Sequence, residues 1–326
     1  MTTLLYILKF LIGLTAIIKG ADYLTDGAAD IARRFGIPSL VVGLTIVAMG
    51  SSAPEFVVSV VSAMEGNTDM ALGNVVGSNI FNILAIMGIT AMVREIKVER
   101  SNVRNDVPFA LLSSVAIAIT AMDSFFNGNE VDNGISRTDG MLLLCLFAVF
   151  MSYTMSIASN GSNAGEEGDT KTGKKNIAKS IIAIIGGLAA LILGGDWFVD
   201  GASGIAETLG VSQSIIALTI VSMGTSAPEL AASVMAARKG DTAMALGNVV
   251  GSVVFNVFFV LGAAATIHPL GIGGITVTDI LVLLVASALL WIFCKFGKTY
   301  YTLTRMEGFM LVLLAAAYYV YLCLNV

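Results

Sequence analysis

Long apolar runs separated by short polar breaks make up most of the hydropathy pattern of this chain. A helix that crosses a lipid bilayer needs roughly 20 mostly apolar residues. Ten stretches satisfy this requirement, near residues 4–31, 38–64, 69–92, 106–122, 138–158, 177–206, 213–237, 243–267, 275–295 and 306–324. Strands of a membrane barrel would alternate apolar and polar residues instead. The pattern therefore predicts an all-α integral membrane protein with ten transmembrane helices.

Composition supports this class. Of the 326 residues, 56% are hydrophobic and only 13% are charged, which would leave a soluble globule with too much exposed apolar surface. Cys145, Cys294 and Cys323 lie inside apolar segments without paired spacing, so neither a disulfide framework nor a zinc site is expected. His268, the only histidine, precedes a proline near a helix end and is expected to be solvated or to cap the helix.

Two motifs occur twice in the chain. TIVAMGSSAPE at 45–55 returns as TIVSMGTSAPE at 219–229, and MALGNVVGS at 70–78 returns unchanged at 244–252, in each case 174 residues later. Such self-similarity indicates two homologous halves. The offset accommodates about five membrane spans, and an odd number of spans inverts the second half relative to the first.

The same offset relates Asp22 to Asp196, deep inside the chain. The first apolar segment is therefore expected to be retained rather than removed as a signal peptide. The resulting prediction is two inverted five-helix repeats, 1–158 and 177–326, joined by a polar linker, 159–176, that is too short to hold a folded domain.

Basic residues collect in alternate loops. If the N-terminus faces outward, 15 of the 18 Lys and Arg residues fall in inner loops, and only Lys9, Lys19 and Arg137 fall elsewhere. The positive-inside rule then predicts that both termini lie outside the cell (inner) membrane and that the linker is cytoplasmic. The net charge of −5 adds little, because it is divided between two sides.

Each repeat carries one carboxylate inside an apolar stretch, Glu55 or Glu229. A carboxylate at mid-membrane costs roughly 2.5–3.5 kcal/mol, and neither motif contains a Lys or Arg, so a mobile cation is the expected partner. Pro54 and Pro228 lack a backbone N–H, so each should kink its helix and leave backbone carbonyl oxygens without a partner. For Pro54 the carbonyl most directly affected is that of Gly50. Irregular backbone at this depth indicates one site between the halves.

Oxygen-bearing side chains accompany both carboxylates. Hydroxyls lie three and four residues before each glutamate, on the same face of a regular helix, and amides with a hydroxyl follow in the next segment at four-residue steps. These candidate ligands are Ser51, Ser52, Thr225 and Ser226, followed by Asn74, Ser78, Asn82, Asn248, Ser252 and Asn256. A pocket of oxygens alone suits Ca²⁺ or Na⁺ rather than zinc or copper.

Several of these features also have a simpler interpretation. A single buried glutamate bonded to a neighbouring hydroxyl is a structural feature, but the duplication of its full context favours a functional site. The aspartates near the segment ends, Asp22, Asp26, Asp196 and Asp200, are expected to be solvated at the interface or to line an access path. A serine hydrolase would need a base near Ser52 or Ser226, and none follows in suitable context, so no enzyme is expected.

The motifs GSSAPE with GNVVGSNIFN, and GTSAPE with GNVVGSVVFN, resemble the two alpha-repeats of the cation/calcium exchanger superfamily, and the resemblance covers essentially the whole chain. It implies ten helices in two inverted halves and alternating access by sliding of the helices near 4–31 and 177–206. It also implies that Ca²⁺ binds Glu55 and Glu229 with oxygens of Ser51 and Thr225. For Na⁺ it adds Ser52, Ser226, Ser78, Ser252 and the carbonyls of Ala48 and Ser222.

Asn82 and Asn256 flank the centre of the implied site, where some relatives, including potassium-dependent exchangers, have an aspartate in the second half. We therefore expect independence from potassium. The sequence predicts a monomeric antiporter that exchanges Ca²⁺ for Na⁺ in the lipid bilayer, without a cofactor or a nucleic-acid partner. The alternative is a Ca²⁺/H⁺ antiporter in which the two glutamates carry protons. A channel is disfavoured, since paired broken helices are typical of carriers.

Overall fold

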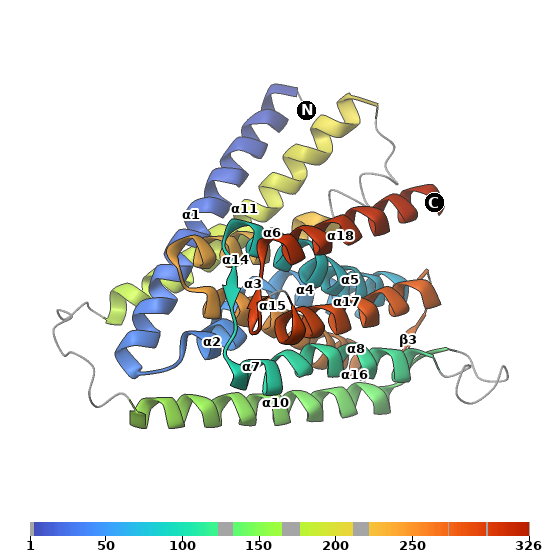
Figure 1. Ribbon diagram of the computed structural model, residues 1–326. Helices are drawn as coiled ribbons and strands as arrows, with labels where there is room; N and C mark the ends of the chain where they lie inside the picture. Colours follow the sequence, from blue (N-terminus) through green and yellow to red (C-terminus); the bar gives the residue numbers. More distant parts are fainter. Residues whose placement is uncertain are drawn as a thin grey trace.

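The computed structural model describes residues 3–122, 133–164, 177–210, 222–272, 274–297 and 299–325. Two long helices, α1 (Thr3–Phe35) and α11 (Ile177–Thr208), run side by side and extend beyond the bundle formed by the other helices (Figure 1). They are the first helix of each predicted repeat. The remaining helices pack on one another beneath this pair.

From the motif helices onward, the described elements of the two halves follow a similar order, although the short helix α7 of the first half has no counterpart among the described residues of the second. In the first half they are α2 (Ser39–Val42), a π-helical segment (Gly43–Val47), α3 (Ala48–Ser51), α4 (Ala53–Met64), α5 (Thr68–Ile80), a second π-helical segment (Phe81–Ile86), α6 (Met87–Val93), α7 (Arg100–Asn105), α8 (Val107–Ala121) and α10 (Arg137–Ala164). In the second half they are α13 (Ser222–Thr225), α14 (Ala227–Lys239), α15 (Thr242–Val254), a π-helical segment (Phe255–Leu261), α16 (Gly262–Ile267), α17 (Val277–Phe296) and α18 (Arg305–Asn325).

Within the described ranges, eight helical stretches are long and apolar enough to cross a membrane, and the bent pair Ser39–Ser51 with Ala53–Met64 makes up to nine. The all-helical membrane architecture is thus confirmed. The predicted span near 213–237 is described only from residue 222 onward, so the tenth helix stays a prediction. Helix α10 continues to Ala164, into the predicted linker, and residues 165–176 of that linker lie outside the described residues.

Short strands, which the hydropathy pattern did not predict, join the two halves. Strand β1 (Ile96–Lys97) pairs antiparallel with β4 (Thr302–Leu303), and β2 (Gly134–Ile135) pairs antiparallel with β3 (Leu270–Gly271). Each two-stranded sheet takes one strand from each half, and β1 and β3 are 174 residues apart. Two-residue strands carry too few residues for a period-two pattern, which explains why the sequence did not reveal them.

Glycines bring α1 and α11 into backbone contact. A Cβ added to Gly187 would lie 2.7 Å from the backbone N of Leu24 and 2.8 Å from the carbonyl oxygen of Gly20, closer than side-chain atoms can approach. The same holds along the whole contact, at Gly13, Gly20, Gly27, Gly187, Gly194 and Gly201. Small residues at a helix interface permit such close packing in membranes. Their seven-residue spacing is visible in the sequence and was missed there.

The turn that follows each glutamate-bearing helix is built identically in the two halves. Gly66 and Gly240 have φ angles of 76° and 93°, a left-handed conformation that glycine adopts without steric cost. Asn67 and Asp241 then accept a backbone N–H from the first turn of α5 and α15, at 3.2 and 3.0 Å. These N-caps fix where the two asparagine-bearing helices begin.

Candidate cation-binding site

The GSSAPE and GTSAPE motifs break their helices. Ser52 has φ −83° and ψ 11°, which ends α3 and begins α4 at a bend of 49°, and Ser226 has nearly the same angles, −89° and 8°, between α13 and α14. Pro54 and Pro228 lie in the first turn of the new helices, where a missing N–H removes no hydrogen bond. The predicted proline kink is therefore a full break in both motifs.

Glu55 and Glu229 consequently lie in the first turns of α4 and α14, with side chains that are 0% exposed. A helix N-terminus carries the positive end of the helix dipole, which stabilises a nearby carboxylate. The break thus places each buried carboxylate where the backbone itself offsets part of its charge.

The hydroxyls bind the carboxylates crosswise. Ser52 Oγ donates to Glu229 Oε1 at 2.7 Å, and Ser226 Oγ donates to Glu55 Oε1 at 3.2 Å. The sequence had placed each hydroxyl beside the glutamate of its own motif, on the assumption of a regular helix. Because the helix is broken at these serines, the three-residue spacing no longer sets the partner, and the contact forms between the halves.

Asn74 and Asn248 hold the glutamate helices from the neighbouring helix. Asn74 Nδ2 donates to the Glu55 carbonyl at 3.2 Å and to Ser59 Oγ at 2.9 Å. Asn248 Nδ2 makes the equivalent bonds to the Glu229 carbonyl at 3.2 Å and to Ser233 Oγ at 2.8 Å. These amides position the backbone at each glutamate rather than its carboxylate. The serines four residues after each glutamate were missed, although their equal offset was a visible signal.

Ser51 links the first motif to the second half of the chain. Its hydroxyl lies 3.3 Å from Asn248 Oδ1 and 3.3 Å from the Ala48 carbonyl, which also accepts the backbone N–H of Ser52 at 3.0 Å.

Ser222, the other predicted carbonyl ligand, is the first residue of α13 and directly follows a stretch outside the described residues. Ser78 is buried, and Thr225 lies at the wall of a cavity described below.

Asn82 and Asn256 each occupy the second position of a π-helical segment. The segment that contains Asn82 packs against α14, and the one that contains Asn256 packs against α4, so each asparagine lies beside the glutamate helix of the other half. π-Helical turns are frequent at functional sites. The two are not equivalent, because Asn256 Nδ2 donates to Asn79 Oδ1 at 3.1 Å, whereas Val253 occupies the position that corresponds to Asn79.

Several buried polar atoms in this region have no hydrogen-bond partner among the described residues. They are Glu55 Oε2, Glu229 Oε2, Asn82 Oδ1 and Nδ2, Asn256 Oδ1 and Ser252 Oγ. Buried polar atoms normally have partners, so such a concentration calls for a ligand. Five of these six atoms are oxygens, and oxygen is the ligand that hard cations prefer.

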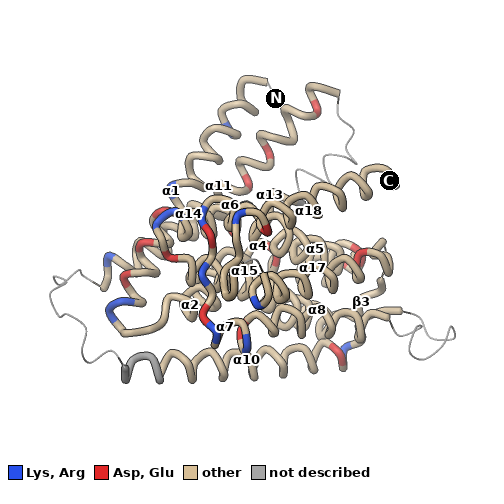
Figure 2. Tube along the Cα trace, viewed as in Figure 1, with Lys and Arg blue, Asp and Glu red and all other residues tan. Residues whose placement is uncertain are grey.

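A cavity of about 310 Å³ borders the two motifs. Asp196 and Asp200 line it together with Thr225 and both motif prolines, Pro54 and Pro228. Figure 2 places the charged residues along the chain in the orientation of Figure 1. For these two aspartates, the predicted role of lining an access path agrees with the geometry.

The corresponding aspartates of the first half have different partners. Lys239 Nζ lies 2.6 Å from Asp22 Oδ1 and 2.8 Å from Asp26 Oδ1, and it also donates to the Asp22 carbonyl and to Thr25 Oγ1. The residue 174 positions before Lys239 is Glu65, so the second pair of aspartates has no equivalent lysine. The two ends of the site therefore differ in sequence and in the partners of their aspartates.

Paired broken helices that bring carboxylates together inside a membrane protein are typical of secondary transporters. Comparison with known protein families identifies which kind of transporter this is. The family described as sodium/calcium exchanger protein matches residues 5–156 and 179–324. The chain belongs to this family.

Individual relatives agree over nearly the full length. CaxA of Alkalimonas amylolytica, which is named as a presumed antiporter, is 37% identical over 94% of this chain and 95% of its own. Sodium/calcium exchanger MaX1 of Methanosarcina acetivorans is 29% identical over 97% of each chain. The structure of the sodium-calcium exchanger NCX_Mj soaked with Na⁺ and without Ca²⁺ matches with a TM-score of 0.82 and 30% identity over 98% of both chains. The family resemblance read from the motifs is confirmed.

Proposed function

We propose that this protein is an antiporter that exchanges Ca²⁺ for Na⁺ at one shared site. The observation that carries the proposal is the crosswise pairing of Ser52 with Glu229 and of Ser226 with Glu55. It brings together two buried carboxylates, each with one oxygen that has no partner among the described residues. Two negative charges balance one Ca²⁺, and monovalent ions that occupy the same oxygens displace it. Competition for one site then couples the two ions.

The ligands that we assign follow the motif positions. Ca²⁺ binds Glu55 and Glu229 with oxygens of Ser51 and Thr225. Na⁺ shares the carboxylates and uses in addition Ser52, Ser226, Ser78, Ser252, the amide oxygens of Asn82 and Asn256, and the carbonyls of Ala48 and Ser222. The unpartnered atoms of Asn82, Asn256 and Ser252 support their part in this set. Since Asn82 and Asn256 carry no charge, transport is expected to proceed without potassium.

We further propose ten transmembrane helices in two inverted repeats that work by alternating access. The crosswise contacts, whose residues are related by the 174-residue offset, and the sheets that each combine one strand from each half support this symmetry. Helices α1 and α11, in backbone contact along their length, move as one unit over the other helices. Both halves of the site come from one chain, which supports a monomer as the working unit.

The proposed orientation has both termini outside the cell (inner) membrane and the linker 159–176 in the cytoplasm. The support is the distribution of Lys and Arg along the sequence, 15 of 18 of which fall in predicted inner loops, and Figure 2 shows basic segments near α2, α7 and α14. Cysteine scanning with a membrane-impermeant thiol reagent on intact cells tests this orientation, and labelling of the linker from outside would reverse it.

The decisive experiment measures uptake of calcium-45 into proteoliposomes under an imposed Na⁺ gradient and, separately, under an imposed pH gradient. We expect the Na⁺ gradient alone to drive uptake, with no requirement for K⁺. Uptake driven only by the pH gradient would instead identify the glutamates as proton carriers and overturn Na⁺ coupling. An exchange of three Na⁺ for one Ca²⁺ moves one charge per cycle, so an imposed membrane potential should contribute about 2.3 kcal/mol per 100 mV.

A further inference from the structure

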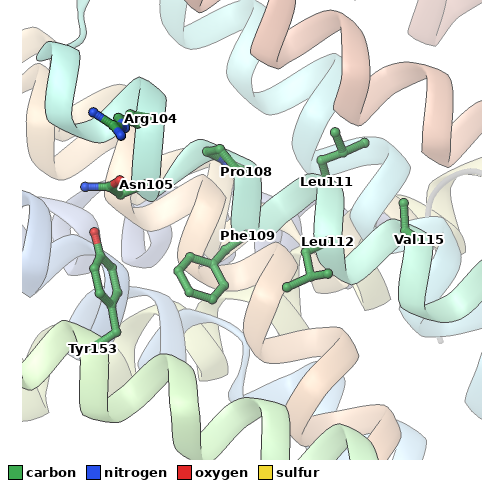
Figure 3. Close-up of a pocket in the computed structure, with 8 residues that line it drawn as sticks. All are labelled: Arg104, Asn105, Pro108, Phe109, Leu111, Leu112, Val115 and Tyr153. Carbon is green, nitrogen blue, oxygen red and sulfur yellow. The ribbon is translucent and has the colours of Figure 1, made fainter.

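A second cavity shares no lining residue with the cavity beside the ion site. It has a volume of about 630 Å³ and is formed by α7, α8 and α10 (Figure 3). Its wall is apolar along α8, from Pro108 and Phe109 to Leu112 and Val115, while Arg104 lies at one end. The cavity thus combines a long apolar wall with one cationic group at its end.

The guanidinium of Arg104 is available to a ligand. Arg104 is exposed, and its side chain takes part in no ion pair or hydrogen bond with the described residues. The nearest acid in the sequence, Asp106, is buried and accepts the hydroxyl of Tyr153 at 2.9 Å instead. An arginine beside an apolar wall binds a phosphate through parallel N–H groups more readily than it binds a neutral polar group.

The stretch of chain that lines the cavity is about as long as one leaflet of a bilayer is thick. From Arg104 to Val115 a helix rises about 16 Å, and half of the hydrocarbon core of a bilayer is about 15 Å. Arg104 lies on α7 together with Arg100, and α7 follows strand β1, which contains Lys97, so all three basic residues precede α8. Basic pockets between membrane helices bind the headgroups of anionic lipids.

The apolar wall is held in place by aromatic packing. The Phe109 ring lies 5.1 Å from that of Phe150 and 5.4 Å from that of Tyr153, measured between centroids. Because the Tyr153 hydroxyl is bound to Asp106, its ring is fixed beside Phe109. The cavity is therefore preformed, and an occupant does not have to order the side chains that contact it.

We propose that this cavity binds an anionic phospholipid, with the lipid phosphate on Arg104 and one acyl chain along Pro108, Phe109, Leu112 and Val115. The charge selects an anionic headgroup over a zwitterionic one, and the apolar wall selects a lipid over a soluble phosphate. Neither the ion site nor its glutamates take part. The proposal therefore stands independently of the ions that are transported.

Native mass spectrometry of the full chain in detergent tests this proposal by counting bound lipids during titration with phosphatidylglycerol, phosphatidylcholine or glycerol phosphate. We expect one phosphatidylglycerol to bind in preference to phosphatidylcholine, and no binding of glycerol phosphate. Arg104→Ala should weaken phosphatidylglycerol binding about tenfold, because a charge-assisted hydrogen bond is lost. Arg100→Ala, on the same helix but outside the cavity, is the matched control and should bind like the unaltered protein.

A second pair of variants tests the apolar wall. Leu112→Trp fills the cavity and should weaken binding of phosphatidylglycerol, whereas Leu142→Trp, at a 54% exposed position of α10 outside the cavity, should not. If Arg104→Ala and Arg100→Ala weaken phosphatidylglycerol binding equally, the binding reflects general attraction by basic residues, and the proposal is overturned. So would equal binding of phosphatidylcholine, or binding of glycerol phosphate. If Arg104→Ala does not fold, Arg104→Gln and the tryptophan pair decide the question.

Discussion

Lys239 connects α14 to the long helix α1, at the end of the site opposite the cavity beside Asp196 and Asp200. Replacing Lys239 is expected to change which side of the membrane the ion site faces. Lys239→Ala eliminates two ion pairs, to Asp22 at 2.6 Å and to Asp26 at 2.8 Å, together with bonds to the Asp22 carbonyl and to Thr25. The aspartate side chains are 39% and 66% exposed, so each ion pair contributes only about 0.2–1 kcal/mol.

The whole set of contacts is therefore worth about 1–2 kcal/mol after screening by solvent. If it stabilises only the state in which the cavity beside Asp196 and Asp200 is open, its loss shifts the equilibrium about 5–30-fold toward the opposite state. If that opposite state is the minor one, its population rises by nearly the full factor.

Reaction of engineered cysteines with an uncharged maleimide measures this shift, in a background with the three native cysteines replaced. Ala21, 0% exposed, corresponds by the 174-residue offset to Gly195 in the cavity wall, so Ala21→Cys reports opening on the opposite side. Its labelling rate should rise about 5–30-fold with Lys239→Ala. Labelling of Val199→Cys, inside the cavity, should fall.

Lys9→Ala is the matched control, because it also removes a lysine–aspartate pair, Lys9 with Asp200 at 2.7 Å. This pair joins α1 to α11, which move together in the proposed mechanism, so labelling at neither cysteine should change. An unchanged rate at Ala21→Cys in Lys239→Ala, or an equal change in Lys9→Ala, would refute the reasoning. High salt should reproduce part of the Lys239→Ala effect by screening the exposed pairs.

Three further predictions follow from the same geometry. Glu55→Gln and Glu229→Gln should each abolish calcium-45 uptake and leave the protein folded by size-exclusion chromatography; uptake retained in either variant contradicts its role. Gly187→Ala should destabilise the α1–α11 contact by about 1–3 kcal/mol in thermal unfolding, whereas Gly186→Ala, with nothing within 4 Å of the new Cβ, should not. Asn79→Val leaves a buried amide N–H without its partner and should raise the Na⁺ concentration for half-maximal transport; an unchanged value would show that Asn79 does not orient the site.

Much of the site was predictable because its signals are local and duplicated. The two GNVVGS segments and the glutamates after each proline stand out in the sequence at one offset. The broken helix follows from the chemistry of proline, whose missing N–H is tolerated at a helix start. The requirement for a counterion follows equally directly from a carboxylate within an apolar stretch.

Other features depend on which residues meet in space, and no periodicity within one segment contains that information. The sequence paired Ser52 with Glu55, whereas the break in the helix turns Ser52 toward Glu229. Lys239, which binds both Asp22 and Asp26, lies on a helix more than 200 residues further along the chain. Only tertiary packing could reveal these partners.

The sequence by itself determined that the chain spans a membrane, that it consists of two related halves, and that each half contributes one carboxylate with hydroxyls and amides. These properties reside in residue types and spacings, which hydrophobicity and helix geometry convert directly into structure. Only the tertiary structure decided that the motifs bind each other crosswise and that one pair of aspartates lines a cavity while the other binds Lys239. Such contacts depend on how the halves approach one another, because hydrogen bonds and ion pairs form over less than 4 Å between segments that are far apart along the chain.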